Sequence, residues 1–141
     1  MIKIKATVVT NGITVAMELA KREDVTVLMP GGNLLSNINS LSGSLALRYL
    51  NDMRFNLMLC SCTAINEYGA YESSIDQCEL KRIVLRHSTN KVLLVDKNKF
   101  ANEATFRTAE LTEYNAIFTN ADDKTVEPLR KIRNVEIINK R

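Results

Sequence analysis

In KVLLVDKNKF, residues 91–100, four apolar residues run directly into Asp96, Lys97 and Lys99. A short, continuous apolar run rich in branched residues is typical of a strand covered on both faces, as in a parallel sheet flanked by helices. In open α/β sheets, ligands bind beyond the carboxyl ends of the strands. The sequence therefore predicts Asp96 and Lys99 at the place where α/β sheets usually receive a polar ligand, and whether one is received depends on the other strands.

Strand-like and helix-like patterns alternate on both sides of this stretch. Strands are predicted at 4–9, 25–29, 55–62, 91–96, 115–119 and 135–138, and helices at 13–23, 45–53, 73–88, 109–114 and 124–133. Polar loops are expected at 33–44 and 63–74. Ser73 or Ser74 is suited to cap the third helix, and Pro128 is expected to start or break the last one. The alternation predicts an α/β fold with a mostly parallel sheet flanked by helices and right-handed crossovers.

Composition places the chain among ordinary globular domains. Its 141 residues are 45% hydrophobic and 25% charged, which predicts one domain spanning 1–141. The net charge is only +3, and the basic cluster near Arg130 lacks the interleaved aromatics of a nucleic-acid surface. No apolar run approaches the length of a membrane span, and no signal peptide opens the chain. We therefore expect a cytoplasmic protein without a membrane partner.

Few residues suit catalysis or metal binding. Cys60 and Cys62 form a C-S-C pair, which is closer than the usual zinc-ligand spacings, and with Cys78 they are interpreted as reduced, semi-buried residues. His87 is the only histidine, so no Ser-His-Asp or Cys-His set can be assembled. The expectation is a protein without a metal site or a cofactor.

The predicted strand ends share a polar character. The five main strands finish in TNG, PGG, CSCT, DKNK and TNAD. Gly31 and Gly32 let backbone N–H groups approach a ligand closely, and Lys99 adds a full charge, so together these ends suit an anion such as a phosphate. The alternative is that polar, glycine-containing turns follow the strands of any α/β protein. Neither a G-x-G-x-x-G fingerprint nor a Walker A loop is present.

The helix at 73–88 carries Glu79, Lys81 and Arg82 close together. Charges on a helix usually form its solvated face, which is the simpler interpretation of all three. A position beside the ligand crevice is the alternative for Glu79 and Lys81.

Six motifs in register give the chain a family resemblance. It resembles the C-terminal sensor domain of DeoR-type sugar-metabolism repressors in VVTNG (8–12), GG (31–32), LSGSLA (41–46), Gly69 ahead of ELKR (79–82), VLLVDKNKF (92–100) and LTEYNAIFTNAD (111–122). The resemblance implies a fold similar to ribose-5-phosphate isomerase, glucosamine-6-phosphate deaminase and the CoA-transferase-like proteins. It also implies a phosphorylated sugar or sugar-derived effector at the strand ends.

The resemblance assigns roles to individual residues. Asp96 and Lys99 match a D-x-x-K that brings a lysine to the substrate phosphate in the related isomerases, so Lys99 is the expected phosphate contact. Asp96 is expected to accept from a sugar hydroxyl or to orient Lys99. The remaining ligand-binding residues that it implies are Thr10, Asn11, Gly31, Gly32, Ser61, Tyr71, Glu79 and Lys81.

Two departures from the family pattern matter. The family normally begins with a winged helix-turn-helix, a strand and a D-x-G-T-T loop, and this chain starts after them, so a chain truncated at its N-terminal side is expected. Contact with operator DNA would then need a helix-turn-helix absent from this chain. The second departure is the CSCT and Tyr71-Glu72 sequence in place of the usual G-A-D-G and T-T residues, which leaves the sugar specificity open.

The leading hypothesis is an effector-binding and oligomerisation domain of a DeoR-type regulator, forming homo-oligomers and having no enzyme activity. A sugar-phosphate isomerase or deaminase on the same fold is the alternative, but the glycine-rich loop that precedes the catalytic glutamate of the isomerases is missing. A third possibility is a dimerisation module whose ligand site is vestigial.

Overall fold

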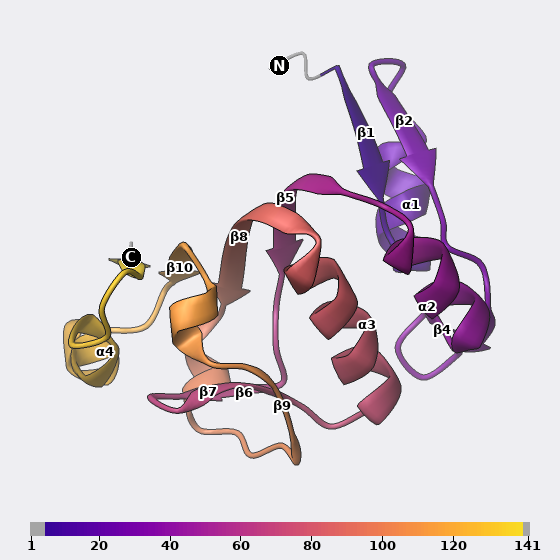
Figure 1. Cartoon of the computed structure of the whole chain (residues 1–141). Helices are drawn as coiled ribbons and strands as arrows, with labels where there is room; N and C mark the ends of the chain where they lie inside the picture. The colour runs from indigo at the N-terminus through magenta and orange to yellow at the C-terminus, as the bar shows by residue number, and fades with distance from the viewer. Residues whose placement is uncertain (1–4, 140–141) are drawn as a thin grey trace. The chain divides into compact units, whose positions relative to one another are not determined.

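A computed structural model of the chain describes residues 5–139, and the chain divides into two compact units, the first ending at Asp52 and the second beginning at Met53 (Figure 1). Four parallel strands in the second unit, flanked by helices, confirm the predicted α/β class. The strands of the first unit form separate, two-stranded sheets.

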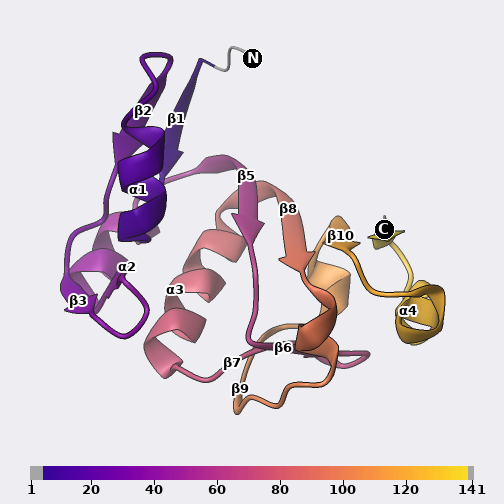
Figure 2. The same ribbon diagram turned by 180° about the vertical axis from the view of Figure 1, so that it is seen from behind.

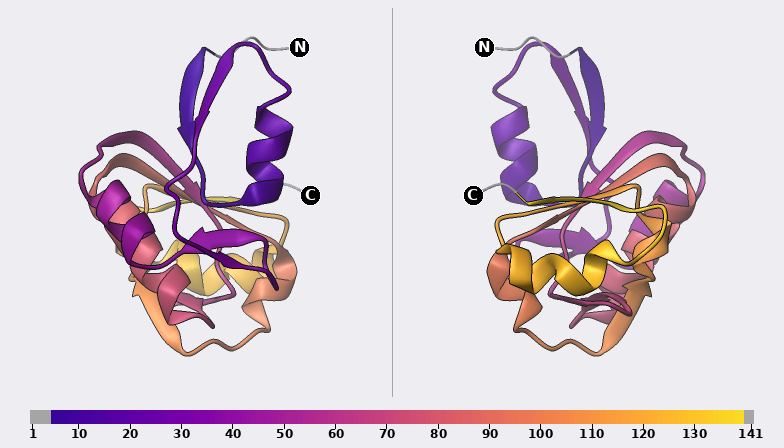
Figure 3. Two further views of the ribbon diagram at one scale, coloured as in Figure 1. Left: turned by 90° about the vertical axis from the view of Figure 1, so that its right-hand side faces the viewer. Right: turned by 90° about the vertical axis from the view of Figure 1, so that its left-hand side faces the viewer.

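The first unit opens with a strand–helix–strand segment. Strands β1 (Ala6–Val9) and β2 (Val25–Leu28) pair in parallel, with Ala6 opposite Val25, and helix α1 (Ile13–Leu19) connects them. Figure 3 shows α1 alongside the two strands, in indigo. The strand, turn and helix predicted here are confirmed within the described residues.

A hairpin and a short helix complete the first unit. Strands β3 (Asn33–Leu35) and β4 (Ser40–Ser42) pair antiparallel and lead into helix α2 (Ser44–Asn51). The predicted loop at 33–44 is therefore wrong, because three-residue strands are too short to show a clear alternation of apolar and polar residues. Asn39 supports the reversal with a φ of +49°, a conformation that asparagine tolerates better than most residues.

The second unit is built on a four-stranded parallel sheet in the order β11–β10–β8–β5. Its strands are β5 (Phe55–Cys60), β8 (Ser88–Val95), β10 (Ala116–Thr119) and β11 (Glu136–Asn139). The register aligns Leu59, Val92, Ala116 and Glu136 across the sheet. Helix α3 (Ile75–Arg86) leads into β8 and packs against β5, as Figure 2 shows, and α4 (Asp123–Arg130) leads into β11.

An antiparallel sheet accompanies the parallel one. Strands β6 (Ala64–Asn66), β7 (Gly69–Glu72) and β9 (Phe106–Ala109) pair in that order, and two short 3₁₀ helices, η1 (Lys97–Phe100) and η2 (Leu111–Glu113), flank β9 along the chain. The loop predicted at 63–74 is thus a second error, since it contains the β6–β7 hairpin. A Cβ added at Gly69 would come 2.5 Å from the carbonyl oxygen of Ala109, which shows how closely β7 and β9 approach.

The core of the second unit lies on one face of the parallel sheet. Leu93 and Val95 of β8 and Ile117 of β10 are buried, whereas Leu94 and Phe118 on the opposite face are 44% and 41% exposed. The expectation that the stretch at 91–96 is covered on both faces is therefore met on one face only.

Helix α4 corrects the expectation for Pro128. The helix begins at Asp123, with the Asp122 side chain accepting from the Thr125 N–H at 2.8 Å, and it continues through Pro128 to Arg130. Proline removes one helical hydrogen bond. The buried side chains of Val126 and Leu129 stabilise the helix by packing, so Pro128 neither starts nor breaks it.

Candidate functional site

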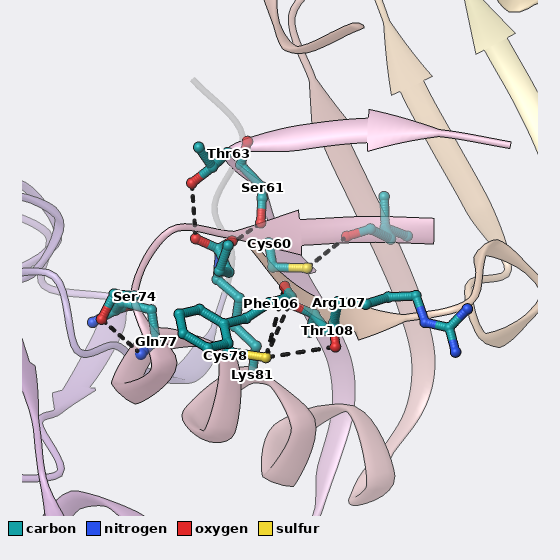
Figure 4. Close-up of polar contacts among 12 residues, drawn as sticks. Cys60, Ser61, Thr63, Ser74, Gln77, Cys78, Lys81, Phe106, Arg107 and Thr108 are labelled. Atoms are coloured by element: carbon teal, nitrogen blue, oxygen red, sulfur yellow. Dashed lines mark hydrogen bonds and ion pairs between the residues drawn. The ribbon is translucent and has the colours of Figure 1, made fainter. Parts of the chain in front are cut away.

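A buried ion pair lies beyond the carboxyl end of β5. The Lys81 ammonium of α3 pairs with the Glu72 carboxylate and donates to the Ser61 carbonyl at 2.6 Å. The Thr63 hydroxyl donates to the other Glu72 oxygen at 3.1 Å. Figure 4 shows Ser61 and Thr63 after β5, with Lys81 reaching toward them. The side chains of Lys81 and Glu72 are only 19% and 8% exposed, so both charges are largely removed from water.

Local structure explains why these residues meet. Thr63 donates its backbone N–H to Tyr71 at 2.9 Å, and Ala64 pairs with Tyr71, so the hairpin brings Thr63 beside Glu72 at the end of β7. The chain then enters α3, where the Ser74 hydroxyl accepts from the Gln77 N–H at 3.5 Å. This confirms the predicted cap. Two turns of α3 then carry Lys81 back to the strand end.

Cys60 and Cys62 flank Ser61, whose carbonyl accepts from Lys81, and Tyr114 lies in the same buried core as Cys62. Burial raises the pKa of the Cys60 thiol to about 11 and that of Cys62 to about 12, and the positive charge of Lys81 opposes both shifts. Burial also raises the pKa of the Tyr114 hydroxyl, and the two cysteine thiols add to this shift. These groups are therefore protonated at neutral pH and are poor nucleophiles. No group of three or more metal-ligating side chains occurs among residues 5–139.

Lys99 lies in η1, directly after β8. The helix contacts β6, and the Asn102 side chain that follows it donates to the Thr63 carbonyl at 3.1 Å. Strands β5 and β8 are parallel neighbours, so the segment that carries Lys99 follows β8 at the same sheet edge at which Ser61 and Thr63 follow β5. Lys99 is half-buried and makes no ion pair with any residue that the structure describes.

Asp96 caps η1. Its carboxylate accepts from the Asn98 N–H at 2.8 Å, its carbonyl accepts from the Lys99 N–H at 3.1 Å, and the Asn120 side chain accepts from the Lys97 N–H at 2.8 Å. The backbone N–H groups of the first turn of η1 are thus occupied. The backbone N–H of Lys99 is therefore occupied, and Asp96 fixes the turn that carries the Lys99 side chain.

Two further predicted residues lie elsewhere around α3. Glu79 pairs with Arg82 at 2.7 Å on an exposed surface, while Arg82 also donates to the carbonyls of Arg107 and Thr108 at 2.5 and 3.4 Å. Residues 79 and 81 are separated by about 200° around a helix, so Glu79 and Lys81 face different directions. Tyr71 lies half-buried in the hairpin strand β7.

The four remaining predicted residues belong to the first unit. The Thr10 hydroxyl accepts from the Gly12 N–H at 3.2 Å, and Asn11 exchanges backbone and side-chain hydrogen bonds with Leu41 of β4. Gly31 and Gly32 have φ values of +70° and +101°, and a Cβ at Gly32 would come 2.3 Å from the Ser42 carbonyl oxygen. The TNG and PGG turns therefore both contact the segment that leads into α2.

Three residues that contribute to the two groups of strand ends are not among the ten predicted ligand-binding residues. Glu72 and Thr63 lie in the segment predicted as a loop, where no periodicity marks a buried carboxylate. Gly43, at φ +96°, caps α2 without a side-chain hydrogen bond. The LSGSLA motif that contains Gly43 is the sequence feature that could have indicated this helix start.

Comparison with known proteins identifies the class of domain. Residues 2–121 match the family described as the DeoR C terminal sensor domain. The chain belongs to this family. None of the helices within residues 5–139 is long and apolar enough to cross a membrane.

The relatives are transcriptional regulators and not enzymes. The chain is 30% identical over 119 residues to the uncharacterized HTH-type transcriptional regulator YulB of Bacillus subtilis, covering 84% of this chain and 46% of the relative. It is 30% identical over 135 residues to the lactose phosphotransferase system repressor of Staphylococcus epidermidis. This match covers 94% of this chain and 53% of the repressor. It is 26% identical over 115 residues to the glycerol-3-phosphate regulon repressor of Escherichia coli. This match covers 81% of this chain and 46% of the repressor. The chain spans about half the length of these curated relatives.

Proposed function

We propose that this sensor domain binds a phosphorylated sugar or a sugar-derived metabolite, and that the Lys99 ammonium contacts the phosphate. The observation that carries the proposal is the environment of Lys99, a half-buried cation without an ion pair among residues 5–139. It lies in η1, which contacts β6 and leads to Asn102, a residue that bonds the Thr63 carbonyl next to the Glu72–Lys81 pair. A partly desolvated ammonium without a counter-ion favours an anionic ligand. The names of two relatives, repressors of the lactose phosphotransferase system and of the glycerol-3-phosphate regulon, support an effector from phosphorylated carbohydrate metabolism.

The ligand would act by shifting the population of regulator assemblies. A metabolite changes operator occupancy only if it binds one state more tightly than the other, and operator binding changes metabolite affinity by the same factor. In this proposal, the chain forms homo-oligomers, and contact with operator DNA is made by a helix-turn-helix part of the regulator.

Calorimetric titration with sugar phosphates and the matching unphosphorylated sugars tests this function. We expect saturable binding of at least one phosphate, about tenfold or more tighter than its parent sugar, because one phosphate contact supplies more than about 1.4 kcal/mol. NMR spectra of the same mixtures should show unchanged ligand. Absence of phosphate-dependent binding would contradict the proposal, and conversion of the ligand would favour an isomerase or a deaminase.

A further inference from the structure

The two lysines near the end of β5 differ in their electrostatic partners. Lys81 is neutralised by Glu72, whereas Lys99 makes no ion pair with residues 5–139. The cluster thus contains one internally balanced pair and one uncompensated cation. The three side chains of Glu72, Lys81 and Lys99 therefore carry a net charge of one positive unit, although two of them are lysines.

The balanced pair is fixed in place. Glu72 is held through both carboxylate oxygens, one by Lys81 and the other by the Thr63 hydroxyl at 3.1 Å, and Lys81 is also held by the Ser61 carbonyl at 2.6 Å. Separating the two charges would leave each of them largely out of water without its partner, which is strongly unfavourable. An incoming anion therefore cannot readily take Lys81 away from Glu72.

We propose that Glu72 determines the charge class of the effector, an inference that rests on the proposed function. The domain accepts a ligand with a single anionic group, bound by Lys99, and an uncharged hydroxyl-bearing end directed toward the Glu72–Lys81 pair. Each carboxylate oxygen has a second lone-pair direction with which to accept a sugar hydroxyl. A second phosphate at that end would meet a pair whose positive charge is already neutralised, so it would lose hydration without gaining an ion pair, which disfavours bisphosphates.

The test compares ligands that differ only in a second phosphate. Glucose 6-phosphate is paired with glucose 1,6-bisphosphate, and the 6-phosphate and 1,6-bisphosphate of fructose form a second pair. In calorimetry at constant ionic strength, the unmodified chain should bind a monophosphate about tenfold or more tightly than its bisphosphate. The Glu72→Gln variant keeps the size of the side chain but frees the Lys81 charge, so it should reduce this preference by about tenfold or reverse it.

A matched control separates a local effect from a change in net charge. Glu127 lies exposed on α4 and makes no ion pair with residues 5–139. Glu127→Gln changes the net charge by the same amount and should keep the preference of the unmodified chain. A purely structural role of Glu72 would lower the affinity for both members of a pair and leave their ratio unchanged.

The outcomes distinguish this inference from the proposed function. An unchanged ratio in Glu72→Gln, or equal or tighter bisphosphate binding by the unmodified chain, would overturn the inference while leaving phosphate sensing intact. Equal or tighter bisphosphate binding is measured on the unmodified chain, so it would overturn the inference even if Glu72→Gln fails to fold. Binding of neither member of either pair, together with failure of the wider panel of sugar phosphates, would overturn both.

Discussion

The strand ends of the two units are built from different chemical groups. In the first unit, the turns after β1 and β2 contact the segment leading into α2 mainly through backbone groups and glycines such as Gly32, with one amide side chain, that of Asn11, and no charged side chain of the described residues. In the second unit, the charged side chains of Lys81, Glu72 and Lys99 lie beyond the carboxyl ends of the neighbouring strands β5 and β8. Strand ends held by backbone contacts are destabilised by an added Cβ, whereas strand ends formed by charged side chains are destabilised by the loss of a charge. The two can therefore be disrupted by different substitutions.

The largest effect is expected from removing the cation of the buried pair. Lys81→Met leaves the Glu72 carboxylate buried without its counter-ion and should lower the free energy of unfolding by about 3–5 kcal/mol. Urea denaturation followed by circular dichroism measures this change. The combined Lys81→Met and Glu72→Gln variant should be more stable than Lys81→Met alone, since no unpaired charge remains.

The exposed ion pair on the same helix provides the control. Glu79→Gln disrupts the Glu79–Arg82 pair, whose side chains are 45% and 39% exposed, and should cost no more than about 0.5 kcal/mol. Equal losses in Lys81→Met and Glu79→Gln would show that burial does not distinguish the two pairs.

A smaller loss is expected from the backbone of the first unit. Gly32→Ala should destabilise the chain by about 2 kcal/mol, because the residue has a φ of +101° and the new Cβ would come 2.3 Å from the Ser42 carbonyl oxygen. Gly31→Ala should cost about 1 kcal/mol, because its φ is +70° but no atom other than those of Gly31 and its chain neighbours lies within 4 Å of the added Cβ. Thermal and urea denaturation measure both variants, and an equal cost would contradict the close contact at Gly32.

The smallest effect at neutral pH concerns the buried thiols. Their pKa values are raised from 9.0 to about 11 for Cys60 and about 12 for Cys62, so the folded state favours the protonated form. This stability is fully present below about pH 9 and is lost as the pH rises toward the folded pKa values, since the unfolded chain ionises first. By about pH 10, each cysteine should account for about 1 kcal/mol of lost stability. Urea denaturation of the unmodified, Cys60→Ala and Cys62→Ala chains at about pH 7.5 and 10 measures this loss, and a pH dependence that neither substitution weakens would contradict it.

Much of the second unit was predictable because its signals are local. The apolar run at 92–95 identified strand β8, and Ser74 identified the start of α3. The two hairpins were missed because their strands contain only three or four residues and depend on pairing partners. The Glu72–Lys81 pair was missed for a related reason, since a carboxylate at the end of a presumed loop gives no sign of burial until the hairpin places it against α3. That all ten predicted residues line one crevice stays a prediction.

In the proposed function, Lys99 binds the phosphate of the effector. Calorimetric titration of Lys99→Met with the tightest-binding sugar phosphate tests it most directly, with Lys97→Met as the control because Lys97 is an exposed lysine in the same 3₁₀ helix. Loss of a charge-assisted contact should weaken binding by about tenfold to a hundredfold in Lys99→Met and leave Lys97→Met close to the unmodified chain. Equal affinities for all three chains would contradict the claim.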